Sequence, residues 1–384
     1  MPIEKITIEN FLELAKQYPI LDVRSPGEYT HAHIPTAHSL PLFTDEERKQ
    51  VGTAYKQQSR EAAIKIGLDY FGVKMRKMVE ETERIVGSWQ LAVGTQQSAS
   101  DLPTANCVLV HCWRGGMRSA AVAWLLDMYG FKVHLLVGGY KAYRKWVRDQ
   151  FEKEYNFNII GGYTGSGKTL LLHELEKHYK TIIDLEGLAN HKGSAFGAIE
   201  DMPQPRQEMF ENALAHALAQ SAVGSEQLAN RSEQFTLDAN CPLPTANCIW
   251  MEDESQRIGN LQIPMPFWST MRRSPVFFMD IPFEERLEYI TEDYGKQKKE
   301  TLQDAILRIQ KRLGGLETKN ALTFLEENNF RECFRILLSY YDKWYHKGLY
   351  NRENISSLLN KIPCTGVDTK ANIQKLLSCN VVSA

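Results

Sequence analysis

The sequence lacks a long apolar run and a leader-like N-terminus. None of its apolar stretches reaches the roughly 20 uninterrupted residues that a membrane-spanning helix needs. Residues 1–5 contain no basic segment followed by an apolar one, which argues against a secretory signal. Together these absences predict a cytoplasmic protein without a membrane role.

Closely spaced cysteine pairs are lacking as well. The seven cysteines are scattered and form no C-x-x-C pair, so neither a disulfide framework nor a zinc site is indicated. A strong excess of charge of one sign is also missing, since the net charge is -2. That value argues against indiscriminate nucleic-acid binding, although a local basic face would suffice to bind one RNA.

The length and the pattern of apolar residues predict two α/β domains. A chain of 384 residues exceeds the roughly 250 to 300 residues that one core usually serves. We expect domains at residues 1–150 and 155–384, each with a mostly parallel sheet. Strands are predicted at residues 20–23, 107–111, 131–137, 157–160, 181–185, 249–252 and 276–279, and helices at 119–129, 140–154 and 170–179.

Other segments are predicted to be elaborations of these domains. Residues 283–345 have mainly helical spacing, so the C-terminal third is expected to be a helical elaboration. Residues 94–106 and 224–247 are polar and resemble surface insertions. The hexapeptide Leu-Pro-Thr-Ala-Asn-Cys occurs at 102–107 and again at 243–248. We assign no chemistry to this repeat.

A cysteine follows directly after the strand predicted at 107–111. Cys112 opens the run Cys-Trp-Arg-Gly-Gly-Met-Arg-Ser, which ends at Ser119. A glycine-containing loop and a helix N-terminus would point backbone N–H groups at the sulfur, which favours the thiolate. Arg114 and Arg118 add positive charge within reach of the sulfur or of a bound anion. We therefore predict that Cys112, Arg114 and Arg118 are catalytic, with Cys112 as nucleophile or sulfur carrier.

This run, together with residues 21–29 and 33–37, resembles the rhodanese homology domain of sulfurtransferases. The resemblance covers nearly all of residues 1–150. It implies that Asp22 and Arg24 hold the fold as an ion pair and take no part in catalysis.

The spacing between the cysteine and the second arginine allows one minor alternative. C-x5-R also resembles the signature of the cysteine-based cell-cycle phosphatases. The bulky Trp113 and Met117 suit a phosphoryl oxyanion poorly, and a phosphatase normally needs a general acid. A phosphatase therefore stays the minor alternative.

A complete phosphate-binding loop follows some fifty residues later, flanked by a predicted strand and a predicted helix. The pattern Gly-x4-Gly-Lys-Thr places backbone N–H groups, a lysine ammonium and a helix N-terminus around a di- or triphosphate. The threonine hydroxyl could ligate Mg²⁺, which is the candidate metal here, although no cofactor is firmly implied. The predicted phosphate-binding residues are Gly162, Gly165, Ser166, Gly167, Lys168 and Thr169.

Acidic residues end two of the strands predicted in this domain. Glu252 and Glu254 could share one side of the strand end, in a metal-binding or base role. An acidic surface turn explains them almost equally well. Asp184 and Glu186 form a second candidate pair with weaker support.

Three further runs are not generic nucleotide-binding motifs; they occupy residues 191–197, 204–211 and 252–259. With the cysteine run and the phosphate loop, they resemble the tRNA 2-selenouridine synthases, in which a rhodanese domain is fused to a P-loop domain. The resemblance runs through essentially the whole chain. It implies conversion of the wobble 2-thiouridine of tRNA to 2-selenouridine via S-geranyl-2-thiouridine, with geranyl diphosphate and selenophosphate as substrates.

Contacts with the tRNA are expected from basic clusters and, at some positions, from tryptophans. The basic candidates are Lys141, Arg144, Lys145, Arg148, Arg272, Arg273, Lys296, Lys298 and Lys299, and the tryptophans are Trp250, Trp268 and Trp344. Core packing is the alternative explanation for most of the tryptophans. The main rival function is a rhodanese-type sulfurtransferase fused to an ATPase or kinase.

Overall fold

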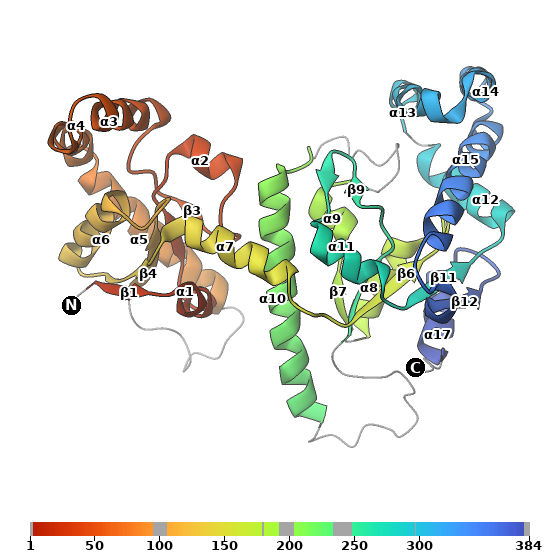
Figure 1. Ribbon diagram of the computed structural model, residues 1–384, viewed down its shortest axis with the longest axis horizontal. Coiled ribbons are helices and arrows are strands. Elements are labelled where there is room, and N and C mark those ends of the chain that lie inside the picture. The colour runs from red at the N-terminus through yellow and green to blue at the C-terminus, as the bar shows by residue number, and fades with distance from the viewer. Residues whose placement is uncertain are drawn as a thin grey trace. The chain divides into compact units, whose positions relative to one another are not determined.

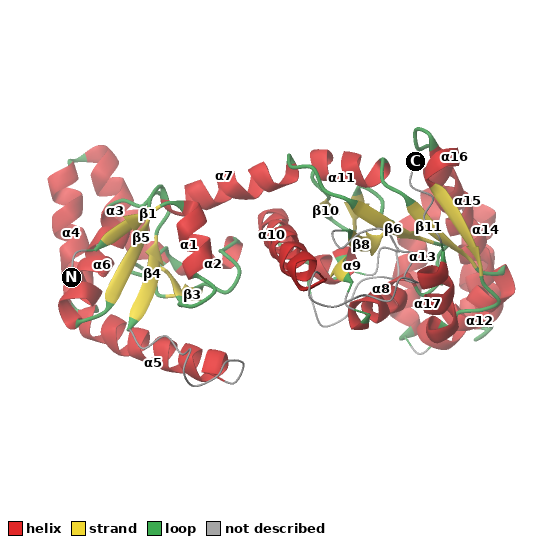
Figure 2. Ribbon diagram, turned by 90° about the horizontal axis from the view of Figure 1, so that it is seen from below, coloured by secondary structure: helices red, strands yellow, loops and turns green. Residues whose placement is uncertain are grey.

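The computed structural model describes residues 3–94, 106–178, 180–191, 203–232, 248–295 and 297–379. The chain divides into two compact units, Met1–Asp149 and Gln150–Ala384. Each unit contains one five-stranded sheet with helices around it (Figures 1 and 2). The predicted α/β class, with a helical region near the C-terminus, is confirmed. None of the helices in the described ranges is long and apolar enough to cross a membrane.

The first unit contains a parallel sheet with the strand order β1-β5-β4-β2-β3. Three helices that the sequence pattern did not predict, α3 to α5, come between β3 and β4. The elements are β1 (Glu4–Ile6), α1 (Ile8–Leu14), β2 (Ile20–Asp22), α2 (Pro26–His31), β3 (His38–Ser39), α3 (Asp45–Gln57), α4 (Arg60–Gly72), α5 (Met75–Gly94), β4 (Cys107–His111), α6 (Met117–Tyr129), β5 (Lys132–Leu136) and α7 (Gly139–Phe151).

Helices cover both faces of this sheet because the central strand β4 is buried on both sides. Val108 and Val110 point to one face, where they pack in a cluster with apolar residues of α4, α5 and α6. The alternate residues of β4, which include His111, point to the other face. There the centre of the His111 ring lies 6.2 Å from the ring centres of Phe11 in α1 and Tyr140 in α7. The end of β4 is therefore fixed from both sides.

The second unit contains a parallel sheet with the order β12-β11-β6-β8-β7. Its elements are β6 (Phe157–Gly161), α8 (Lys168–Lys177), β7 (Thr181–Ile183), α9 (Leu185–Ala189), α10 (Gln207–Ser232), β8 (Ile249–Glu252), β9 (Arg257–Ile258), β10 (Leu261–Gln262), α11 (Met265–Arg272), β11 (Val276–Asp280), α12 (Phe283–Tyr294), α13 (Lys299–Leu313), α14 (Gly315–Glu326), α15 (Phe330–Tyr350), α16 (Ile355–Leu358), β12 (Leu359–Pro363) and α17 (Thr369–Ser378).

Apolar side chains of α8 and α17 pack on one face of this sheet. Leu171 and Leu172 of α8 share a buried cluster with Ile373 and Leu376 of α17. On the other side, the ring of Phe157 in β6 lies 5.1 Å from that of Phe267 in α11. Helices α12 to α15, which come between β11 and β12 in the sequence, form a further apolar cluster. The helix that follows the phosphate loop is therefore held between the sheet and α17.

Three predictions about this unit need correction. The C-terminal region is not only helical, because β12 adds an edge strand beside β11. The strand predicted at 181–185 ends at Ile183, since the Asp184 side chain accepts from Gly187 N at 2.6 Å and caps α9. The insertion predicted at 224–247 is helical through Ser232 in α10. Residues 95–105 and 233–247 lie outside the described residues.

A buried ion pair joins the end of β2 to the rest of the first unit. Arg24 Nη2 donates to Asp22 Oδ2 at 2.6 Å and to Ala32 O at 2.7 Å. The Arg24 guanidinium also lies 3.8 Å from the centre of the Tyr140 ring at the start of α7. Both charged side chains are at most 1% exposed. The structure thus gives Asp22 and Arg24 the structural role that the rhodanese resemblance implies.

Replacement of Arg24 by leucine should strongly destabilise the first unit. The Asp22 carboxylate would remain buried without its partner, which typically costs about 3–5 kcal/mol in free energy of unfolding. Hydrogen-exchange mass spectrometry on β4 peptides would measure this loss in the intact chain. Arg76→Leu is the matched control, because Arg76 pairs with Glu80 on an exposed helix face and should leave β4 exchange unchanged. Equal exchange in both variants would contradict a stabilising role of the buried pair.

Candidate active sites

The thiol loop connects the end of β4 to the start of α6. Cys112 is 3% exposed, and its Sγ lies 3.1 Å from Ser119 Oγ in the first turn of α6. The Ser119 hydroxyl also lies 3.1 Å from Gly116 O. The backbone carbonyl of Cys112 accepts from Tyr140 N at 2.8 Å, which fastens the loop to α7. The sulfur is therefore buried with the apolar cluster of the first unit and lies beside the Ser119 hydroxyl, at the carboxyl edge of the sheet.

Two glycines with positive φ allow the close approach between this loop and the start of α7. Gly115 has φ +65°, and a Cβ there would lie 2.7 Å from Leu136 O. Gly139 has φ +56°, and a Cβ there would lie 2.5 Å from Gly115 N. Larger residues would therefore push the loop away from α7.

The two arginines predicted to be catalytic differ in their surroundings. Arg118 Nη1 donates to Glu28 Oε2 at 2.8 Å. Burial alone would raise the pKa of Glu28, but the hydrogen bond and charge of Arg118 hold it below its ordinary value. Arg114 is exposed in the loop. Sequence reasoning did not single out Glu28, although Ser25 and Glu28 form a capping box at the start of α2.

Apolar side chains surround this loop on its exposed side. Trp113 is 38% exposed and Met117 is 50% exposed. The Trp113 ring is tilted against that of Tyr140 at 5.7 Å, so it is held in place. The thiol site therefore combines a buried sulfur, a cationic side chain and an apolar rim.

The phosphate loop joins β6 to α8 in the second unit. Gly167 adopts φ +70° directly before α8, which opens the helix N-terminus toward the loop. Lys168 Nζ donates to Gly162 O at 3.1 Å. Thr169 Oγ1 donates to Glu186 Oε2 at 2.8 Å. The weaker of the two acidic pairs in the sequence thus supplies the carboxylate that contacts the loop threonine.

Residues far away in the sequence support this loop from behind. Arg286 in α12 donates to Thr164 O at 3.0 Å, and both of its Nη atoms donate to the Asp342 carboxylate in α15. Tyr345, also in α15, accepts from Gly162 N at 3.4 Å. Gly165 packs so closely on α12 that a Cβ there would lie 2.6 Å from Ile290 Cδ1. No local sequence signal marks these supporting residues.

The acidic residues at the end of β8 and directly after it have different contacts. Asp253 accepts from Tyr345 OH at 2.8 Å and pairs with buried Arg352. Glu252 is fully buried, and its Oε2 accepts from Leu185 N at 3.2 Å, whereas its Oε1 has no partner within the described chain. Burial, followed by the charges of Asp184 and Glu186, raises the pKa of Glu252 well above its ordinary value. Burial and the charge of Glu186 act in the same direction on Glu254.

A pocket of about 730 Å³ opens at the phosphate loop. Glu186, Asp253 and Glu254 line it, whereas the buried Glu252 does not. Lys168, Arg272 and Arg312 bring positive charge to it. Much of the remaining lining is aromatic or apolar; it consists of Tyr289, Ile290, Tyr294, Tyr340, Tyr341, Trp344, Tyr345 and Leu349. The pocket can therefore accept a phosphorylated ligand whose other end is apolar or aromatic.

The predicted RNA-contacting residues are spread over several environments. Lys145 pairs with exposed Asp149, and Arg272 donates to Gly348 O at 2.8 Å at the wall of the P-loop pocket. Trp250 is buried in the core, whereas Trp344 is 49% exposed and lies near Arg312 and Lys347. Lys296 and residues 192–197 lie outside the described residues. The four basic candidates of α7 belong to the first unit, and the other described candidates belong to the second.

The fold and the two loops define the class of this protein as a rhodanese-like domain followed by a P-loop domain. The family model of the rhodanese-like domain matches residues 7–145, and that of the tRNA 2-selenouridine synthase AAA domain matches residues 155–361. The second model covers more than half of the chain, and curated relatives match the chain along most of the chain's length. The chain therefore belongs to the tRNA 2-selenouridine synthase family.

Curated relatives from three bacteria illustrate this similarity; all three are named tRNA 2-selenouridine synthase. The protein from Hydrogenovibrio crunogenus is 35% identical over 86% of this chain and 89% of its own length. That from Sulfurovum sp. is 32% identical over 87% of this chain and 88% of its own length. The protein from Shewanella frigidimarina is 33% identical over 86% of this chain and 88% of its own length.

Substitution of Gly139 by alanine should displace the thiol loop and expose Cys112. Alkylation of Cys112 under native conditions, followed by mass spectrometry of its peptide, should be faster than in the unmodified chain. Gly130→Ala is the control, since Gly130 also has positive φ but a Cβ there meets nothing within 4 Å. Both variants carry the backbone penalty of about 1–2 kcal/mol, and only Gly139→Ala should change the reactivity. Identical alkylation rates would show that Gly139 does not hold the loop.

Proposed function

We propose that this protein converts the 2-thiouridine at the wobble position of tRNA to 2-selenouridine in two steps. Geranyl diphosphate first alkylates the sulfur, and selenium from selenophosphate then replaces the geranylated sulfur. The observation that carries the proposal is a phosphate loop opening into an aromatic-walled pocket, in a chain that also holds a cysteine in the loop before a helix N-terminus. The family relatives are tRNA 2-selenouridine synthases by name, which fits this substrate.

In the first step, the sulfur of 2-thiouridine attacks C1 of geranyl diphosphate. The bond between C1 and the bridging oxygen breaks, diphosphate leaves, and the base loses its N3 proton. The loop amides and Lys168 would stabilise the charge that develops on the departing diphosphate. Trp344 and Tyr345 would face the allylic carbon, where positive charge develops, with their aromatic rings. The pocket thus offers complementary surfaces to both ends of the prenyl donor.

Mg²⁺ is part of this proposal because the residues beside the loop fit it. The Thr169 hydroxyl and the Glu186 carboxylate lie together at the pocket wall and would hold the ion. No group of three or more metal-ligating side chains occurs in the described ranges, but Mg²⁺ is commonly held by one or two carboxylates and the substrate phosphates. When bound, the ion would neutralise charge on the leaving diphosphate.

In the second step, selenium becomes bonded to C2 of the base and geranylthiol leaves. Overall, S-geranyl-2-thiouridine, selenophosphate and water give 2-selenouridine, geranylthiol and phosphate. We assign to Cys112 the role of delivering selenium at the oxidation level that it has in selenophosphate. The thiolate would attack phosphorus and release selenide beside C2, and water would then free phosphate from the cysteine, so the step needs no oxidant. Arg114 and Arg118, together with the loop amides, would hold the anionic donor. The exposed Trp113 and Met117 would offer an apolar contact to the leaving geranyl group.

The two steps should be separable with two variants. Cys112→Ser should abolish selenouridine formation but leave geranylation intact, because the phosphate loop is unchanged. Lys168→Ala should lower the rate of geranylation by about 10²–10³, as loss of one stabilising contact to a developing anion typically does. Mass spectrometry of digested nucleosides would measure both products from 2-thiouridine tRNA.

Omission of single substrates provides the control for this experiment. Without selenophosphate, the geranylated nucleoside should accumulate, and without geranyl diphosphate neither product should form. Normal selenation by Cys112→Ser would overturn the role of the cysteine. Unchanged geranylation by Lys168→Ala would move the diphosphate site elsewhere. ATP hydrolysis stimulated by tRNA, without any nucleoside change, would favour the rival sulfurtransferase fused to an ATPase.

The aromatic wall should determine affinity for the prenyl chain and not for the diphosphate. Trp344→Ala should raise the KM for geranyl diphosphate by roughly 10- to 100-fold, the effect expected from loss of an apolar contact worth about 1–3 kcal/mol. Inhibition by inorganic diphosphate should stay unchanged, since Lys168 and the loop remain. Trp124→Ala, a similarly exposed tryptophan in the first unit, is the control. An equal loss of diphosphate affinity would place Trp344 near the phosphates instead.

A further inference from the structure

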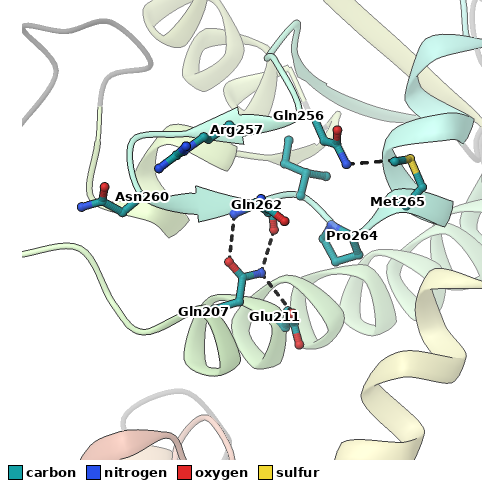
Figure 3. A pocket seen from close by; sticks show the side chains of 9 residues that line it. Gln207, Glu211, Gln256, Arg257, Asn260, Gln262, Pro264 and Met265 are labelled. Carbon is teal, nitrogen blue, oxygen red and sulfur yellow. Dashed lines mark hydrogen bonds between the residues drawn. The ribbon is translucent and has the colours of Figure 1, made fainter. Parts of the chain in front are cut away.

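A second pocket lies in the C-terminal unit, between α10 and the β9–β10 hairpin (Figure 3). Its volume is about 600 Å³. It is built from residues of the 204–211 and 252–259 runs, together with Asn260 and Gln262 of the hairpin and the segment that follows it. These runs carry part of the family resemblance, yet neither proposed step uses this pocket. It therefore needs its own explanation.

Two glutamine side chains hold the pocket in shape. Gln207 donates to Gln262 O at 2.7 Å and accepts from Gln262 N at 2.8 Å, so its amide pairs with the hairpin backbone as another strand would. Gln204 likewise accepts from Asn260 N at 2.7 Å and donates to Ile258 O at 3.1 Å. As Figure 3 shows, Gln207 reaches from α10 to the hairpin. The frame is therefore fixed before any ligand binds.

Other polar groups of the pocket are left over for a ligand. In the described part of the chain, the side chains of Asn260 and Gln262 have no protein partner, and Arg257 uses only Nε, which donates to Gly259 O. Within the same described part of the chain, the Gln256 side chain donates only to the sulfur of Met265, at 3.8 Å, and this sulfur is a weak acceptor. Amides offer a donor and an acceptor side by side, as the edge of a nucleobase does.

The remaining walls suit the flat face of a base. Ile263, Pro264 and Met265 form an apolar side, and Met265 is 54% exposed. Arg257 and Glu211 contribute charges of opposite sign, so the pocket has no excess of positive charge for a polyphosphate. Unpaired bases of RNA are recognised by this combination of a flat contact and hydrogen bonds to the base edge.

One short segment lines both pockets of this unit. Asp253, Glu254 and Ser255 line the P-loop pocket, and the next two residues, Gln256 and Arg257, line the second pocket. An extended chain covers at most about 3.6 Å per residue, so the Cα atoms of Glu254 and Arg257 lie within about 11 Å. Neighbouring nucleotides of one RNA loop can bridge such a separation.

We propose that the second pocket binds one unpaired nucleobase of the RNA substrate, close to the nucleotide whose sulfur enters the P-loop pocket. The inference rests on the proposed function in that the substrate is an RNA with an exposed loop. In this arrangement, the amides of Gln256 and Asn260 bind the base edge. Arg257 adds a hydrogen bond to the same base or its ribose.

Abasic substitution in the RNA combined with side-chain substitution in the full-length chain tests this proposal. The probes are anticodon stem-loops with 2-thiouridine, in which one loop nucleotide at a time lacks its base. Binding is measured without geranyl diphosphate or selenophosphate. The unmodified chain should lose affinity on the order of tenfold or more at one loop position next to the 2-thiouridine. Gln256→Ala and Asn260→Ala should weaken binding of the intact loop by a similar factor.

The decisive result is the combination of the two changes. When the missing base is the one that the pocket binds, the variants and the unmodified chain should bind the abasic RNA with equal affinity. The contact between the pocket and that base is then already absent. Gln303→Ala, an exposed amide on α13, should behave like the unmodified chain at every position. Thermal unfolding at the same temperature as the unmodified chain would show that the variants are folded.

Two outcomes would overturn the inference. If the variants bind the intact loop as tightly as the unmodified chain, the pocket does not contact the RNA. The other outcome is that Gln256→Ala and Asn260→Ala weaken binding by the same factor whichever loop base is missing. If Arg257→Gln also reduces the salt dependence of binding, the pocket contacts only the RNA backbone. Because binding is measured without either donor, failure of the geranylation mechanism would leave this result intact.

Discussion

Both candidate sites depend on one constraint, which is that a buried parallel strand must end in a loop whose backbone N–H groups face solvent. In the first unit the loop follows β4, and in the second it follows β6. The helix that comes next presents its unpaired N–H groups at the same edge. In the function that we propose, stabilisation of an anion would come first from the backbone, and side chains such as Lys168 and Arg114 would add to it.

The local parts of this arrangement could be predicted from the sequence, since strand, loop and helix are adjacent in the chain. Cys112 and the Gly-Lys-Thr segment are found where their neighbours predict them. Arg286 and Tyr345 could not be predicted, because they reach the phosphate loop from positions 122 and 183 residues away. Edge strand β12 was missed because its residues are largely half-exposed and lack a clear apolar alternation.

The electrostatics of the second unit separate two kinds of acid. Asp253 is committed to Arg352 and Tyr345, so it holds α15 against the loop. Glu252 and Glu254 have pKa values raised by burial and by nearby carboxylates. Glu186, in contact with Thr169, is then the acid best placed to act at the pocket itself. Sequence spacing favoured Glu252 and Glu254 over Glu186, because spacing does not reveal which carboxylates are buried or paired with distant partners.

The position of β12 and α17 has a consequence for the order in which the protein matures. The helix that begins at Lys168 packs against α17, and β11 gains its second neighbour only from β12. During synthesis, the ribosome completes every element of the rhodanese-like unit long before residues 359–378 emerge. The cysteine loop can therefore assemble while the chain is still growing. The phosphate loop receives its last structural cover only after those residues have left the exit tunnel.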